Sequence, residues 1–201
     1  MFFALRLKSA LGKNLPKQVV YMPNWNKKQR VNWAGQGNYP VALMLHHTAG
    51  AVTDSTNPAA KGNQKGANDG IINFVQNHYE VPAANFTLDR DGTVYVHSAY
   101  PVWHAGVGSF EGKKPWDIFG IPSDMGNDYL LGVEIMSKGQ KKDFTKAQKE
   151  SLDKLQEACG AASKWPVLKR KADVRHPRHK DWTRRKPDIL YEQAEVNNWM
   201  T

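Results

Sequence analysis

A short apolar segment that ends in two adjacent histidines, VALMLHHTAG at residues 41–50, constrains the fold of this 201-residue chain more than any other feature. Its first five residues are all apolar, and such a continuous run is typical of a strand that is buried on both faces. His46 would then lie at the end of a rigid strand, where a ligand can reach the edge of a sheet. Because a lone histidine in this position is more often structural, a metal site requires partners elsewhere in the chain.

The rest of the sequence alternates between strand and helix patterns. Further strand signals lie at residues 19–22, 85–97 and 129–136, and helix signals at 5–11, 70–79, 145–163 and 189–200. Asp91 and Gly92 predict a hairpin turn, and Thr145 with Gln148 forms a capping-box pattern. The segment 109–128 has no periodicity and is expected to be irregular. This alternation predicts an α/β protein with a central mixed β-sheet that is flanked by helices.

Length and composition fit a single main domain. With 40% hydrophobic and 23% charged residues, the chain can bury a core without covalent links. We expect residues 36–201 to form this domain, and residues 1–35 to be a lead-in packed on it, because Trp25 and Trp33 give the lead-in apolar surface. The single cysteine, Cys159, excludes an internal disulfide and a cysteine-rich zinc finger.

The net charge of +9 predicts attraction to polyanions such as nucleic acid, anionic lipid or an acidic bacterial envelope. The basic stretch 169–186 has few interleaved aromatic residues and no helix-turn-helix pattern, so specific nucleic-acid binding is the weaker hypothesis. No apolar run approaches the roughly 20 residues of a membrane span, and residues 1–14 lack a secretory pattern. We therefore expect a protein that stays in the cytosol unless another system exports it. Separately, we expect a monomer.

A candidate metal site emerges when His46 is considered with the segment RHKDWTRRKPD at residues 178–188. Zinc at a hydrolytic site takes three protein ligands and leaves a fourth position for water. His179 and Asp188 are separated by a loop that is long enough to fold back, so both could face the ion that His46 binds. Two imidazoles and one carboxylate suit zinc and leave it with a net positive charge, which acidifies water.

Five motifs resemble, in their order along the chain, the zinc-dependent N-acetylmuramoyl-L-alanine amidases of type 2, which share a fold with peptidoglycan recognition proteins. These motifs are LHHTAG, NFTLDRDGTVY, WHAGVG, NDYLLGVEI and RHKDWTRRKPD, and the resemblance covers roughly residues 36–190. It implies a catalytic domain with one zinc ion that cleaves the amide bond between N-acetylmuramic acid and L-alanine in bacterial peptidoglycan. The anionic cell wall would attract its positive charge.

The early segment LRLKSALGKNLPKQVVYMPNW resembles the lead-in of amidases from phages that infect actinobacteria. This resemblance implies a phage endolysin, which would remain in the host cytoplasm until a holin releases it to the cell wall. A bacterial autolysin exported by another route is the alternative.

The resemblance also implies a role for each motif residue. His46 and His179 match the zinc-binding histidines, and Asp188 matches the third ligand, which is Cys or Asp in the family. Glu134 matches the acidic residue that serves as general base, and Lys186 matches the basic residue that stabilises the oxyanion.

The chain departs from the family at two positions. Arg178 replaces the usual glycine before the second histidine ligand, so the local backbone could differ there. Ala84 replaces a tyrosine that is the family's alternative base, which strengthens the case for Glu134.

Trp103 and His104 lie in a loop that lines the substrate groove in the family, and are therefore the candidate substrate-binding residues. His47 and His176 are the less favoured alternatives to the chosen histidine ligands. A module of the same fold that binds peptidoglycan without cleaving it is the main alternative function. Such modules typically lack a metal ligand, whereas this chain has a complete candidate set.

Overall fold

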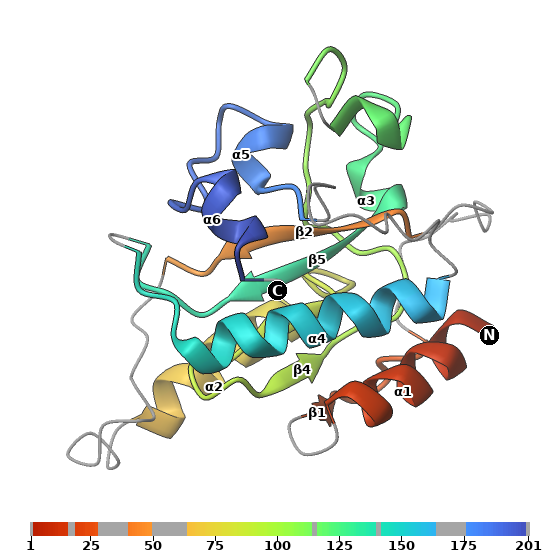
Figure 1. Ribbon diagram of the computed structural model, residues 1–201. Helices are drawn as coiled ribbons and strands as arrows, with labels where there is room; N and C mark the ends of the chain where they lie inside the picture. The colour runs from red at the N-terminus through yellow and green to blue at the C-terminus, as the bar shows by residue number, and fades with distance from the viewer. Residues whose placement is uncertain are drawn as a thin grey trace.

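The computed structural model describes residues 2–15, 19–27, 40–49, 64–113, 116–139, 142–163 and 176–199. Within them, five strands form one mixed sheet in the order β1-β4-β3-β5-β2 (Figure 1). The β3 and β4 strands are antiparallel, and the other neighbouring pairs are parallel. The strands are β1 (Val19–Tyr21), β2 (Ala42–His47), β3 (Phe86–Leu88), β4 (Val94–Val96) and β5 (Leu130–Ile135). The prediction of an α/β fold with a central mixed sheet is thus confirmed.

Two helices, α1 and α4, lie side by side against one face of the sheet (Figure 1). Leu43 and Leu45 of β2 point to this face and join the largest apolar core. The described helices are α1 (Phe2–Asn14), α2 (Gln64–Asn77), α3 (Gly126–Tyr129), α4 (Lys146–Ser163), α5 (His179–Trp182) and α6 (Gln193–Asn197). None of the described helices is long and apolar enough to cross a membrane.

The lead-in helix α1 is part of this core. Its Leu7 and Leu11 are fully buried in the same cluster as Leu155 of α4. The expected boundary near residue 35 stays a prediction, because residues 28–39 and with them Trp33 lie outside the described part of the chain.

The opposite face of the sheet carries the functional side chains. Because side chains alternate along a strand, Met44 and His46 point away from α1 and α4. Trp182 of α5 is fully buried in a second apolar cluster with Met44 on this face. The chain passes so closely that a Cβ on Gly108 would lie 2.5 Å from the Trp182 ring. This packing places α5 and the loop around Gly108 next to the end of β2.

The predicted helices and loops are only partly right. The α4 helix begins as expected, with hydrogen bonds between Thr145 and Gln148 in both directions. The prediction of a helix over residues 189–200 is wrong for the first of these residues, because α6 begins only at Gln193. There the backbone is held by other contacts, including a hydrogen bond from Arg178 to the Tyr191 carbonyl. The segment expected to be irregular, 109–128, contains a short 3₁₀ helix (Trp116–Phe119) and the start of α3.

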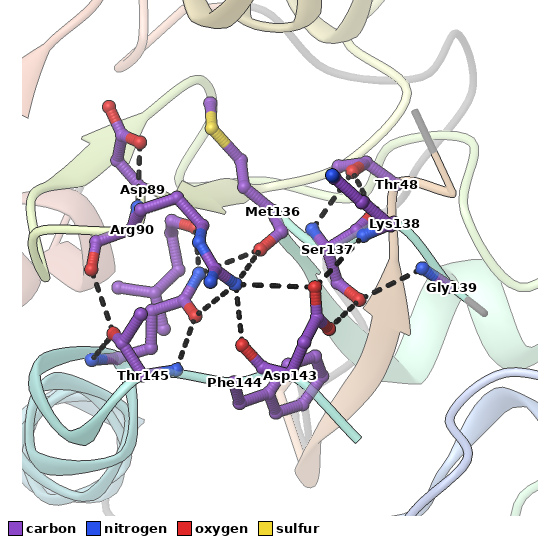
Figure 2. Close-up of polar contacts among 12 residues, drawn as sticks. Thr48, Asp89, Arg90, Met136, Ser137, Lys138, Gly139, Asp143, Phe144 and Thr145 are labelled. Atoms are coloured by element: carbon purple, nitrogen blue, oxygen red, sulfur yellow. Dashed lines mark hydrogen bonds and ion pairs between the residues drawn. The ribbon is translucent and has the colours of Figure 1, made fainter. Parts of the chain in front are cut away.

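A buried polar cluster that we call the Arg90 network joins the carboxyl ends of β3 and β5 to the start of α4 (Figure 2). The Arg90 guanidinium donates to the Asp143 carbonyl at 2.6 Å and forms an ion pair with the Asp143 carboxylate at 3.5 Å. That carboxylate accepts a hydrogen bond from the Ser137 hydroxyl. Thr48, two residues after His46, donates to the Ser137 carbonyl at 3.2 Å. The network therefore fixes the strand ends beside the functional face.

Candidate metal and active site

The structure brings the three predicted ligands together from separate elements. His46 lies near the end of β2, His179 begins α5, and Asp188 lies six residues after the last residue of α5. The Nδ1 atoms of the two histidines are 3.0 Å apart. The Asp188 Oδ2 atom lies 3.3 Å from Nδ1 of His179 and 3.6 Å from Nδ1 of His46. All three residues are buried, and they form a group that could hold a metal ion.

These distances fit a tetrahedral ion. With bonds of roughly 2.0–2.1 Å, a tetrahedral zinc site separates its donor atoms by about 3.3 Å. The three observed separations, 3.0, 3.3 and 3.6 Å, lie around that value. Two histidine nitrogens and one carboxylate oxygen are also a donor set of the kind found at catalytic zinc sites, which keep a fourth position for water.

Arg178, which replaces the family's glycine, anchors the element that carries His179. Its guanidinium binds the Asp181 carboxylate at 2.7 and 2.9 Å, while its backbone N–H also donates to that carboxylate. The Leu45 N–H donates to the Pro177 carbonyl at 2.8 Å, so the segment entering α5 is tied to β2. The backbone here is therefore fixed without a glycine, and His179 is held beside His46.

The electrostatics of the cluster favour a bound cation. Burial, followed by the nearby His179, lowers the pKa of His46 to about 4. Burial would raise the pKa of Asp188, but the adjacent imidazoles of His179 and His46 outweigh this effect and hold the pKa well below its usual range. At neutral pH the cluster therefore combines a carboxylate with a neutral His46, which can offer a lone pair.

Glu134 lies next to the candidate ligand His46 across the sheet. In the parallel pairing of β5 with its neighbours, Glu134 is level with His46 on β2 and Thr87 on β3, so the three side chains share one face. Its Oε2 atom is buried and has no hydrogen-bond partner among the described residues. Burial, followed by the charge of Asp188, raises the pKa of Glu134 to about 8.

A pocket of about 530 Å³ opens beside the candidate ligand His179, which is part of its lining. The lining also contains three residues that the sequence predicted for substrate binding or catalysis: Trp103, His104 and Lys186. Lys186 is exposed, and Trp103 is 45% exposed, so both side chains are accessible from solution. His104 differs because it is buried and both of its ring nitrogens have hydrogen-bond partners.

Six other residues line this pocket without having been predicted as site residues, and four of them have polar side chains: Tyr79, Asn127, Thr183 and Arg185. Arg185 is adjacent to Lys186 in the basic stretch, and this position could have predicted it as a pocket residue. Its guanidinium donates to the Val107 carbonyl at 3.1 Å and so links Arg185 to the loop that follows Trp103 and His104. Asn127 and Thr183 lie within two of the motifs, but the residues around them do not predict a place in the pocket, because their position depends on how distant loops meet.

The two alternative histidines are placed elsewhere. His47 follows His46 directly on β2, so its side chain points to the opposite face of the sheet. His176 is fully buried and is not part of the group of converging metal-binding atoms. Among the described residues, the geometry therefore favours the set His46, His179 and Asp188.

Comparisons with known proteins identify the family of the chain and support its fold. Residues 36–188 match the family described as N-acetylmuramoyl-L-alanine amidase. Among solved structures, the chain is similar to an AmpD derivative, with a TM-score of 0.53 and 19% identity over 92% of this chain and 94% of that one. This likeness supports the fold. A search of curated protein sequences found no match.

A second similar structure is the Ph2119 endolysin from the Thermus scotoductus MAT2119 bacteriophage Ph2119. Its TM-score is 0.48, and its identity is 15% over 91% of this chain and 99% of that one.

Proposed function

This chain belongs to the N-acetylmuramoyl-L-alanine amidase family, and we propose that it uses one zinc ion to hydrolyse the amide bond between N-acetylmuramic acid and L-alanine in bacterial peptidoglycan. The observation that carries the proposal is the convergence of His46, His179 and Asp188 beside an open pocket. A zinc ion held by these residues would acidify a water molecule and polarise the carbonyl of the scissile amide.

Glu134 is the proposed general base. It lies on a rigid strand, level with the ligand His46 and on the same face of the sheet. Its unpartnered Oε2 atom is available to accept a proton from the attacking water, and the resulting acid can pass that proton to the leaving nitrogen. The positive charge of a bound metal would counteract the raised pKa of Glu134 and favour the carboxylate form.

Lys186 is the proposed group for the developing negative charge on the carbonyl oxygen. It lies two residues before the ligand Asp188 and lines the same pocket. Its ammonium group can therefore stabilise an oxyanion that forms beside the metal ligands. Trp103, on the accessible rim, is the proposed contact for the sugar or peptide part of the substrate.

The proposed biological setting is host-cell lysis by a monomeric phage endolysin. It is supported by the resemblance of the lead-in segment to those of phage amidases. The net charge of +9 supports a sequence-independent attraction to the anionic cell wall, which salt should weaken.

Mass spectrometry of digested peptidoglycan tests the chemistry directly. We expect free stem peptides that begin with L-alanine, formed only when zinc is present and lost after chelation. The matched control is Glu134→Gln, which keeps the shape of the side chain, should retain zinc and should lower turnover by about 10²–10⁴-fold.

New reducing sugar ends in place of free peptides would contradict amidase activity and indicate a glycosidase. Binding to peptidoglycan without any cleavage product would instead favour the non-catalytic recognition module. Retention on DNA at moderate salt, again without cleavage of peptidoglycan, would favour nucleic-acid binding.

A further inference from the structure

We propose that His104 is a positioning residue of the metal site, which holds the proton of His46 on Nε2 and thereby directs the Nδ1 lone pair of His46 at the metal. This inference rests on the metal site of the proposed function. It assigns His104 a role beyond the substrate contact expected from its loop.

The argument begins at the Leu130 backbone carbonyl, which can only accept a hydrogen bond. It lies 3.0 Å from Nε2 of His104, so this nitrogen carries the proton. A neutral imidazole has one N–H, and the Nδ1 atom of His104 is therefore an acceptor. The Nε2 atom of His46 lies 3.3 Å from it and must donate. The Nδ1 atom of His46 is then left with a lone pair, which faces the other two ligands.

The second histidine ligand is oriented in the same way by the next residue. The Nε2 atom of His179 lies 3.0 Å from the Ala105 carbonyl, so it donates there and leaves its Nδ1 atom unprotonated. The adjacent residues 104 and 105 thus supply the outer hydrogen-bond partners of both histidine ligands. Two lone pairs and the Asp188 carboxylate then face one point, where they repel one another unless a cation lies between them.

Neighbouring residues fix the position of both the backbone and the ring of His104. The Asn127 side-chain oxygen accepts hydrogen bonds from the backbone N–H groups of His104 and Ala105, both at 2.8 Å. Gly132 of β5 provides the space for the ring, because a Cβ there would lie 2.5 Å from Cγ of His104. The rings of His46 and His104 meet edge-on at 88°. A residue that only contacts substrate does not need such a fixed position, whereas a residue that orients a metal ligand does.

This role explains why His104 and its neighbour Trp103 differ. His104 is 9% exposed and has both ring nitrogens engaged, whereas Trp103 is 45% exposed on the rim of the pocket. Loss of Trp103 should therefore affect substrate affinity, and loss of His104 should affect metal affinity. Outer partners of metal-binding histidines typically contribute about 10–100-fold to metal affinity.

The test compares zinc affinity in the full-length wild-type protein and three variants, by competition with a chelating dye. His104→Phe keeps a flat ring but removes both hydrogen bonds, and should weaken zinc binding by about 10–100-fold. His104→Asn keeps an acceptor near the position of Nδ1 and should recover most of this loss. The matched control, Trp103→Phe, should leave zinc affinity unchanged.

Nitrogen-15 NMR of the metal-free protein provides a readout that does not depend on zinc. We expect the proton of His46 on Nε2 in the wild type and a mixture of tautomers in His104→Phe. A wild-type His46 protonated on Nδ1, or His104→Phe with wild-type zinc affinity, would overturn the proposal. If the wild type bound no zinc but His46 carried its proton on Nε2, the hydrogen-bond chain would stand and the metal site of the proposed function would fail.

Discussion

The Arg90 network and the proposed metal site are two buried polar clusters near the carboxyl ends of the strands, but they differ in whether the protein itself neutralises their charges. In the Arg90 network, the guanidinium meets the Asp143 carboxylate and backbone carbonyls, so its charge is neutralised within the protein (Figure 2). In the metal site, Asp188 is surrounded by imidazole nitrogens, while the nearby Glu134 keeps a buried oxygen without a partner among the described residues.

Because of this difference, we expect the Arg90 network to contribute mainly to the stability of the fold and the proposed metal site mainly to activity. A buried charge whose partners all lie within the chain contributes to holding the fold in one conformation, and removal of one partner leaves the other uncompensated. Buried acceptors without protein partners weaken the fold but can receive an ion, a water or a substrate. Changes in the metal site should therefore alter activity more than stability, and changes in the Arg90 network should do the reverse.

The largest expected effect is the loss of metal and activity in His179→Ala. This change removes one of the three ligands, so the number of zinc ions bound per chain should fall from one to zero. Release of peptide from peptidoglycan should fall to the level without enzyme, whereas far-UV circular dichroism should keep its wild-type shape. Wild-type turnover in this variant would show that His179 is not a metal ligand. It would also contradict the expectation that changes in the metal site alter activity more than stability.

The next effect concerns stability and is expected for Arg90→Met. The change leaves the buried Asp143 carboxylate without its cation, which should lower the free energy of unfolding by about 3–5 kcal/mol in urea denaturation. The fraction that remains folded should still bind one zinc ion. The double change Arg90→Met with Asp143→Leu is the control, because it removes both charges and should recover part of the loss. Equal stability of Arg90→Met and the wild type would mean that the network does not hold the strand ends.

The smallest expected effect is the pH dependence of stability that arises from Glu134. Its pKa in the folded protein is raised to about 8, above that of an unfolded chain, so the folded state favours the protonated acid. The resulting stability is present below the unfolded pKa and is lost as pH rises through about 8. In metal-free protein at pH 9, Glu134→Gln should therefore be more stable than the wild type by about 1–3 kcal/mol.

Thermal unfolding at several pH values measures this difference. It should shrink toward pH 4 and also when zinc is added to the wild type, since a nearby cation stabilises the carboxylate. A difference that stays constant across this pH range would show that Glu134 does not titrate in the folded protein as its surroundings indicate.

Much of the fold and part of the site followed from local sequence patterns. The apolar run before His46 predicted β2, Asp91 and Gly92 predicted the β3–β4 hairpin, and Thr145 with Gln148 predicted the start of α4. These features depend on side-chain periodicity and on hydrogen bonds between residues that are close in sequence. The candidate set His46, His179 and Asp188 was also chosen from the sequence, because its residue types suit a single metal, and the structure brings these three side chains together.

Other features were decided only when distant segments packed together. The late start of α6 depends on contacts such as the hydrogen bond from Arg178 to the Tyr191 carbonyl, and these override the helical pattern of residues 189–200. The proposed role of His104 requires contacts with His46 on one strand and Leu130 on another. Residue types alone predicted which atoms can bind a metal, but tertiary packing decides which nitrogen carries a proton, because its partners come from elements far apart in the chain.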